Sequence, residues 1–451
     1  MHRQVARRQR FQTGMPLHET TRTDSDRRAT TEPALPRRRI AIFAEAVTLA
    51  HVARPLALAR GLDPERYDVT FVCDPRYADF LAAEPWRIHW IDSISGERFR
   101  DSLAKGRPIY DAATLQRYVD DDLAVIDAVR PDVVVGDFRL SLSASARLAA
   151  IPYAAICSTY WSPYARQRVP IPDHPLVGML GLATAQMLFD VFRPLAFAHH
   201  TRPLNRVRRS RGLPSLGLDL RHTYTDADWV LYADPPDLVA TERLPVNHRY
   251  LGPVLWSPPV APPAWWADLP DDRPVVYVTM GSSGSQHDLA TALDALSGVD
   301  CTVIAATAGG GPVSVRSSRQ FVADYLPGEA ASQRAQLVVC NGGAPTSQQA
   351  LAAGRPVLGI ARNLDQHLNM QCIERAGAGV RLRSDKATVD AVRRAVEHLL
   401  TTPAFAAAAG RLAQSFATQD APRTFAAVVE EMLGQPAAAG VTPARRSAAG
   451  P

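Results

Sequence analysis

Short apolar runs alternate with helical patterns along this chain, and the alternation occurs twice, with a proline-rich stretch between the two halves. A strand buried on both faces of a sheet reads as a continuous apolar run, and parallel strands need crossover connections, usually helical. The pattern therefore predicts an α/β fold with two doubly wound, Rossmann-like halves. The predicted strands span residues 40–43, 69–73, 87–91, 133–136 and 153–157, then 275–279, 302–305, 337–340, 357–360 and 380–382. The predicted helices span residues 52–62, 115–130, 143–150, 289–296, 347–353, 366–376, 388–400 and 424–433.

The stretch 253–274 holds seven prolines in 22 positions, which neither a helix nor a central strand accommodates. We interpret it as a linker between an N-terminal domain at 39–252 and a C-terminal domain at 275–434. Residues 1–38 and 435–451 lack a hydrophobic period, and we expect both to be disordered tails. Because ligands of open parallel sheets bind beyond the carboxyl ends of the strands, both halves should present loops to a cleft between them.

Composition excludes several other classes of protein. The net charge of +5 owes much to arginines in the first 39 residues, so we interpret it as a solvated tail and expect no nucleic-acid partner. Five scattered cysteines fit a reducing compartment better than a disulfide framework, and their spacing does not suggest zinc. No apolar window of about 20 residues and no secretory h-region occur, so we expect a cytoplasmic protein.

The turn at 340–349 has the sequence CNGGAPTSQQ and joins a predicted strand to a predicted helix. Gly342 and Gly343 let a ligand approach the backbone, and the free N–H groups at the helix start favour an anion. Thr346 adds a hydroxyl donor, while Pro345 suits the first helical turn, where its missing N–H costs little. These features predict a phosphate site, although a tight turn without a ligand stays open as an alternative.

The chain continues from this turn through Gly354 and Pro356 to Asp365 and Gln366. From 341 to 366 it resembles, without a gap, the signature of the family-1 glycosyltransferases, which include UDP-glycosyltransferases and bacterial macrolide glycosyltransferases. A weaker resemblance over 39–433 implies the GT-B fold, two facing Rossmann-like domains whose last helix packs back on the first. The resemblance implies donor-binding roles for these residues: Gly281, Ser282, Ser283, Asn341, Gly342, Gly343 and Thr346 at the diphosphate, Tyr325 and Leu326 at the base, Gln349 at the ribose, and Asp365 and Gln366 at the sugar. A capping role in the following helix is the alternative for the last two.

Three positions depart from the family signature. Asn341 replaces a His, Pro345 replaces a Gly or Asn, and Gln349 replaces a Glu. Asn341 can still donate to a phosphate oxygen but carries no charge, and a hydrogen bond to a charged group contributes about 1.5–3 kcal/mol. The sequence therefore predicts a nucleotide pocket that is present but altered. It leaves three consequences open: weaker donor binding, a different nucleotide or loss of catalysis.

His51 follows the first predicted strand and its loop, where the first helix begins. An alcohol is a poor nucleophile at neutral pH, and a positioned imidazole can take its proton as the new bond forms. The family carries its base in this place, so the resemblance implies that role for His51. Asp137 directly follows the strand at 133–136 and resembles the Asp that orients this base, with capping of the next helix as the alternative.

Residues 174–212 depart from the alternation. A mostly apolar stretch at 176–192 is followed by six arginines. The pattern has three interpretations: core helices with a basic exposed end, a lid over a hydrophobic substrate, or a membrane-surface element.

Together these features predict an inverting glycosyltransferase that moves a hexose from a nucleoside diphosphate sugar, UDP-linked by resemblance, to a hydroxyl of a small hydrophobic acceptor. We expect no further cofactor and no metal. The altered signature leaves two alternatives, namely a catalytically impaired binding or activating protein and a nucleotide-sugar epimerase on the same fold.

Overall fold

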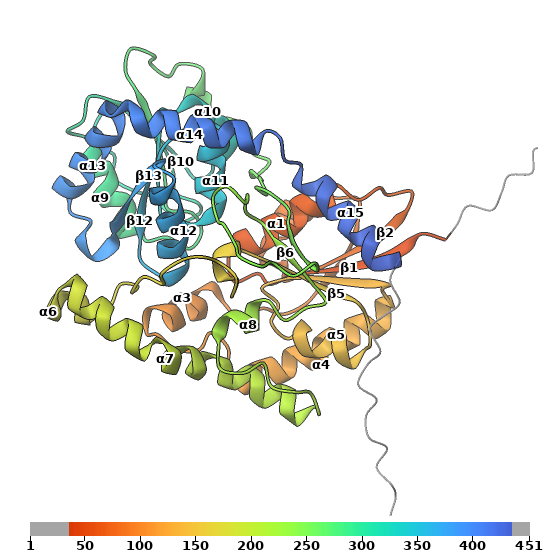
Figure 1. The fold of residues 1–451 in the computed structure, drawn as a ribbon. Helices are drawn as coiled ribbons and strands as arrows, with labels where there is room; N and C mark the ends of the chain where they lie inside the picture. Colours follow the sequence, from red (N-terminus) through yellow and green to blue (C-terminus); the bar gives the residue numbers. More distant parts are fainter. Residues whose placement is uncertain (1–35, 435–451) are drawn as a thin grey trace, which may run out of the picture. The chain divides into compact units, whose positions relative to one another are not determined.

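Two parallel sheets organise residues 36–434, the part of the chain that the computed structural model describes (Figure 1). The predicted tails at 1–38 and 435–451 lie almost wholly outside these residues. All ten predicted strands are present, and the strands within each sheet pair in parallel. The α/β class with two Rossmann-like halves is therefore confirmed.

The N-terminal sheet has seven strands. They are β1 (Arg38–Ala44), β2 (Tyr67–Cys73), β3 (Arg87–Trp90), β4 (Val133–Asp137), β5 (Tyr153–Cys157), β6 (Trp229–Tyr232) and β7 (His248–Tyr250). Their order is β3-β2-β1-β4-β5-β6-β7, so the direction of winding reverses between β1 and β4. Ala44 at the end of β1 pairs with Asp137 at the end of β4. Loops that leave these two strands therefore start side by side, at the point where such sheets bind ligands.

The C-terminal sheet repeats this plan with six strands. They are β8 (Val275–Thr279), β9 (Thr302–Ala306), β10 (Gln320–Ala323), β11 (Leu337–Cys340), β12 (Val357–Ala361) and β13 (Gly379–Arg383), in the order β10-β9-β8-β11-β12-β13. Thr279 pairs with Cys340, which brings the turn at 281–285 next to the turn at 341–347.

Helices connect the strands of both sheets. They are α1 (Ala50–Ala59), α2 (Ala78–Leu81), α3 (Gly96–Ala104), α4 (Ala112–Val129), α5 (Leu142–Leu148), α6 (Pro175–Leu180), α7 (Leu182–Ser210), α8 (Leu220–Tyr224), α9 (Gln286–Leu296), α10 (Gly328–Arg334), α11 (Ala344–Ala352), α12 (Leu364–Arg375), α13 (Val389–Thr401), α14 (Pro403–Phe416) and α15 (Ala421–Gly434). Phe425 and Val429 of α15 lie in the core of the N-terminal sheet with Leu56, so the last helix packs back on the first half, as the resemblance implies.

Sequence patterns missed three strands and several helices, among them the 14-residue α14. β6, β7 and β10 have three or four residues each, too few for a period to show. The proline-rich stretch contains only the short 3-10 turn Ala264–Trp266, as its composition predicts. The domain bounds at 39–252 and 275–434 stay a prediction.

The segment 174–212 forms two helices, α6 and α7. The interpretation as core helices holds for Val177 and Ala185, which are buried, but not for most of the apolar side chains around them. Met187, Val191 and Leu195 of α7 are 59%, 66% and 67% exposed. Arg208, assigned to the exposed basic end, is instead buried and paired with Asp226. Between residues 36 and 434, no helix has the length and hydropathy that spanning a bilayer requires.

Candidate active site

His51 and Asp137 come together at the switch point of the N-terminal sheet. Asp137 is the last residue of β4, and His51 lies in the first turn of α1, just beyond the end of β1. The Nδ1 atom of His51 is 2.7 Å from the Oδ1 atom of Asp137. The carboxylate is fully buried, whereas the imidazole side chain is 18% exposed. One ring nitrogen is thus held by a buried carboxylate, and the other has no partner within the described part of the chain.

Phe138 fixes the plane of the His51 ring. The two rings stack with their centroids 4.5 Å apart and an interplanar angle of 13°. Phe138 has a φ of +60°, in the left-handed region that non-glycine residues rarely occupy. The surrounding structure must hold this conformation in place, and such strained residues concentrate at functional sites.

Arg54 is the site residue that sequence reasoning missed. It lies one helical turn after His51, and its Nε and Nη2 atoms donate to Oδ2 and Oδ1 of Asp137 at 2.9 and 2.7 Å. Its Nη2 atom is also 3.1 Å from Nδ1 of His51. Burial opposes the charge of the guanidinium, but the Asp137 carboxylate raises the pKa of Arg54 above its usual range. Asp137 is therefore shared between a permanent cation and the candidate base. The i,i+3 spacing of His51 and Arg54 was the one signal available in the sequence.

The two glycine-containing turns of the C-terminal sheet lie together. The side-chain amide of Asn341 donates to the Ser283 hydroxyl at 3.2 Å, and its oxygen accepts from the Gly343 N–H at 3.1 Å. Gly343 is the N-cap of α11, so the first N–H groups of this nine-residue helix have no intrahelical acceptor. The half-buried Thr346 stands in its first turn. These groups form an array of donors at the positive end of a helix dipole, an arrangement that favours an anion.

A hydrogen bond joins the two halves of the site. The Leu49 N–H, just before α1, donates to the Ser282 hydroxyl at 3.2 Å. Leu49 precedes His51 by two residues, and Ser282 precedes the Ser283 that binds Asn341. The structure therefore places the candidate base beside the candidate diphosphate turns.

Gly342 has a conformational role that its neighbour lacks. Its φ is +77°, and a Cβ atom there would lie 2.6 Å from Cγ of Met370. A Cβ at Gly343 would meet nothing closer than the Asn341 oxygen at 3.3 Å.

We expect Gly342→Ala to lower the free energy of unfolding by about 1–3 kcal/mol and to weaken nucleotide binding, because it strains the turn and displaces Met370. Gly343→Ala is the matched control and should cost far less. Denaturant unfolding and calorimetric titration with nucleoside diphosphates measure both effects, and equal losses in the two variants would contradict this account.

The remaining predicted donor residues have partners within the chain. Asp365 accepts from the Trp161 indole N–H at 2.8 Å and lies 3.3 Å from the Tyr160 hydroxyl. The Gln366 side chain accepts from the Asn363 N–H in the capping box of α12 and also from the Arg362 N–H, so the capping alternative holds for it.

Gln349 donates to the Trp256 carbonyl and the Ser257 hydroxyl. Tyr325 is half-buried and meets Phe80 edge to face, while the Leu326 side chain lies in the core and can offer only its backbone to a ligand. The roles that the resemblance implies for these residues stay predictions.

Phe138, the ring stacked on His51, belongs to a cluster of aromatic residues. Phe138 contacts Tyr110, Phe99 and Tyr224 at centroid distances of 6.3, 6.1 and 5.8 Å. Tyr224 in turn contacts Trp161 at 4.9 Å. Tyr110 and Tyr224 also line a small hollow of about 20 Å³ together with Leu204 of α7. An aromatic cluster therefore lies next to the imidazole through Phe138, which suits a hydrophobic molecule.

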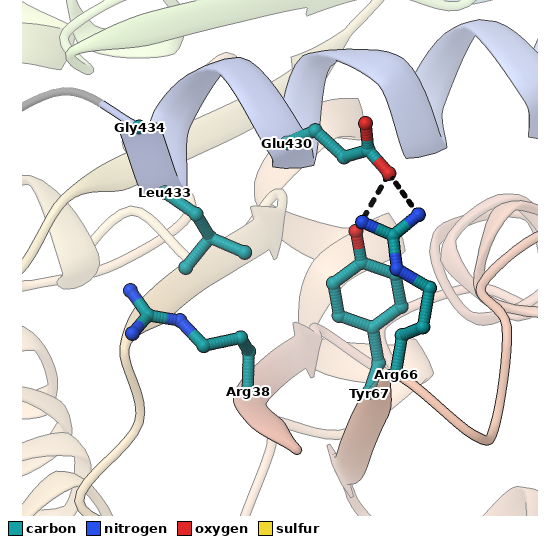
Figure 2. Close-up of a pocket in the computed structure, with 6 residues that line it drawn as sticks. All are labelled: Arg38, Arg66, Tyr67, Glu430, Leu433 and Gly434. Atoms are coloured by element: carbon teal, nitrogen blue, oxygen red, sulfur yellow. Dashed lines mark hydrogen bonds and ion pairs between the residues drawn. The ribbon is translucent and has the colours of Figure 1, made fainter. Parts of the chain in front are cut away.

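A larger hollow of about 450 Å³ lies at the opposite end of the N-terminal sheet. Figure 2 shows Arg66 and Tyr67 directed toward Glu430 of α15, with Arg38 across the hollow. Arg38 and Tyr67 begin β1 and β2, so this hollow borders the amino ends of the strands. It lies away from the edge where parallel sheets bind their ligands.

Comparisons with known proteins agree with this geometry. The family described as erythromycin biosynthesis protein CIII-like, C-terminal domain, matches residues 290–432. A PGL/p-HBAD biosynthesis glycosyltransferase from Mycobacterium tuberculosis is 52% identical over 388 residues, which cover 86% of this chain and 91% of that relative. A PGL/p-HBAD biosynthesis rhamnosyltransferase from Mycobacterium bovis is 54% identical over 380 residues, or 84% of each protein.

Among solved structures, the spinosyn rhamnosyltransferase SpnG in complex with thymidine diphosphate is similar with a TM-score of 0.63 at 17% identity. The match covers 87% of this chain and 100% of that structure, which supports the fold alone. The two relatives establish the family, because each is at least 52% identical to this chain and each alignment covers at least 84% of both proteins. The chain is therefore a glycosyltransferase with the GT-B fold, and it belongs to the family that contains these two mycobacterial enzymes.

Proposed function

We propose that this enzyme transfers a hexose, with inversion, from a nucleoside diphosphate sugar to the hydroxyl of a hydrophobic acceptor, and that His51 is its general base. One observation carries the proposal. The His51–Asp137 pair, in which the two atoms lie 2.7 Å apart, is linked through Leu49 and Ser282 to the donor array at Asn341.

The chemistry at His51 follows from its partners. Its Nδ1–H donates to Asp137, which leaves the lone pair of Nε2 to accept the proton of the acceptor hydroxyl. The buried carboxylate fixes the tautomer and stabilises the imidazolium that forms during transfer. The stacked Phe138 holds the ring in the plane of this hydrogen bond. The acceptor oxygen can then attack the sugar carbon from the face opposite the departing diphosphate.

Departure of the diphosphate requires compensation of its developing charge. Asn341, Thr346 and the N–H groups that begin α11 would donate to its oxygens, and Ser282 and Ser283 would complete the shell. Preorganised donors of this kind contribute strongly because they need no reorganisation during the reaction. Asp365 would accept from a sugar hydroxyl beside Trp161.

We infer the class of donor from the relatives and the class of acceptor from the aromatic residues near the site. A relative named a rhamnosyltransferase and a similar structure solved with thymidine diphosphate support a pyrimidine nucleoside diphosphate carrying a hexose or deoxyhexose. Tyr325 would stack on the base. The rings around Phe138 favour a lipophilic phenol or alcohol as acceptor.

The test is a transfer assay with two donors, UDP-glucose and dTDP-rhamnose, and a panel of lipophilic phenols and alcohols. We expect glycosylated product and nucleoside diphosphate in equal amounts, and only when an acceptor is present. An altered nucleotide sugar formed without acceptor would instead indicate an epimerase. Product of retained anomeric configuration would contradict the inverting mechanism. If the protein binds nucleotide but turns over neither donor, the result would favour the impaired binding protein.

A further inference from the structure

The exposed apolar side chains of this enzyme concentrate on one segment. Seven of the twelve large hydrophobic residues that are exposed in the described structure lie on α6, α7 and the junction between them (yellow-green in Figure 1). Single exposed hydrophobic residues are ordinary, but a contiguous set marks a surface that meets a partner. We name this set the apolar row; it consists of Met179, Leu180, Leu182, Met187, Val191, Phe192 and Leu195.

Arginines continue the same face of α7. Arg202, Arg206 and Arg209 follow Leu195 at intervals of seven, four and three residues, which keeps them on one side of the helix. All three are exposed, and none forms an ion pair within residues 36–434. We name them the basic row. The other three arginines of residues 174–212 pair with carboxylates, and the single acidic residue of this segment, Asp190, pairs with Arg168. The basic row therefore carries positive charge that is uncompensated within the described part of the chain, and the partner that it fits is anionic.

We propose that the apolar row and the basic row together dock the enzyme on an anionic lipid surface. A helix with apolar side chains beside arginines lies in the plane of a membrane interface, where the apolar side enters the acyl boundary and the cations meet lipid phosphates. Met187, Val191 and Leu195 follow one another at four-residue intervals on the side of α7 that the basic row continues, and an extended apolar and cationic strip of this kind suits a flat bilayer.

The same helix reaches the acceptor side of the active site. Leu204 and His200 of α7 line the small hollow that Tyr110 and Tyr224 share, and both tyrosines contact Phe138. A lipophilic acceptor dissolved in the bilayer would thus reach the active site along α7, the helix that lies on the membrane. Docking itself does not depend on the proposed function, because vesicle binding can be measured without turnover.

The experiment is co-flotation of the full-length protein with vesicles of phosphatidylcholine alone or of phosphatidylcholine with phosphatidylglycerol. We expect binding to the anionic vesicles that weakens as salt is added. The variant with Arg202, Arg206 and Arg209 all changed to Gln should bind about a hundredfold more weakly, since each arginine near an anionic surface contributes about 1 kcal/mol, a factor of roughly five. The variant with Met187, Val191 and Leu195 changed to Gln should lose at least about tenfold by removing buried apolar area.

Matched controls change the same number of residues elsewhere on the surface. Leu218, Val246 and Val315 changed to Gln remove exposed apolar side chains, and Arg394, Arg411 and Arg423 changed to Gln remove exposed charge. All variants keep the arginines of residues 1–38, so that contribution cancels in the comparison. Wild-type binding that both test variants retain would overturn the proposal. So would a wild type that ignores vesicles but forms a dimer that the apolar variant abolishes in light scattering, because the row would then be a subunit interface.

Discussion

Replacing His51 by alanine is expected to lower kcat by about 10²–10⁴-fold, the usual contribution of a positioned general base. The imidazole is held by Asp137 through one ring nitrogen and stacks on Phe138, and Leu49, two residues before it, contacts the donor turn at Ser282. Without it the acceptor hydroxyl must lose its proton to water. Because His51 does not belong to the donor array, the KM for the nucleotide sugar should change little. Initial rates at saturating acceptor and donor measure both constants.

The control for this variant is His398→Ala. His398 lies exposed on α13, on the C-terminal half of the chain, and its removal should leave turnover unchanged. Thermal unfolding of both variants shows whether they fold. A His51→Ala enzyme with wild-type kcat would refute the base assignment. If the variant loses activity only because the KM for the donor rises, His51 contributes to donor binding instead.

The sequence predicted those parts of the site that follow from local patterns. Apolar runs located the strand ends beside His51 and Asp137, and the pairing of the two residues followed from the resemblance to the family, with capping of the next helix as the alternative for Asp137. The glycine turn at 341–347 could be placed because a strand, two glycines and a helix are all local signals.

What depends on packing between distant segments could not be predicted. Tyr110 and Tyr224 are far from Phe138 in the sequence, and only the folded chain brings their rings against it. The apolar stretch that begins α7 had three open interpretations, because hydropathy does not tell which side of a helix the rest of the chain covers. Arg54 looked like an ordinary helix residue, since its burial depends on where β4 ends.

Replacing Arg54 by methionine is expected to lower the free energy of unfolding by about 3–5 kcal/mol, because it leaves the buried Asp137 carboxylate without its cation. The Arg54 fork makes two of the hydrogen bonds to this carboxylate, at 2.9 and 2.7 Å. Chemical denaturation measures the loss. Arg60→Met at the end of the same helix is the control, because the Arg60–Glu84 pair has a half-exposed guanidinium and such pairs contribute about 0–1 kcal/mol.

A double variant separates the lost partner from the lost packing. If the cost of Arg54→Met is an unpaired buried charge, Asp137→Asn added to it should restore much of the stability, since the second change removes that charge. If the double variant is less stable than either single one, Arg54 acts through packing and the charge argument fails.

Arg54 should also affect catalysis through the base beside it. Its Nη2 atom lies 3.1 Å from Nδ1 of His51 and 2.7 Å from the Asp137 oxygen that His51 contacts. Without the guanidinium, the Asp137 carboxylate loses two hydrogen bonds that fix it, and the imidazole loses the fixed orientation that a general base needs. We therefore expect kcat of Arg54→Met to fall by up to about 10²-fold while the KM for the nucleotide sugar changes little, and Arg54→Lys, which keeps the charge, to retain more of kcat. A residue with a purely structural role would lower stability without this split between kcat and KM, so initial-rate measurements on the folded variants decide whether Arg54 positions the base.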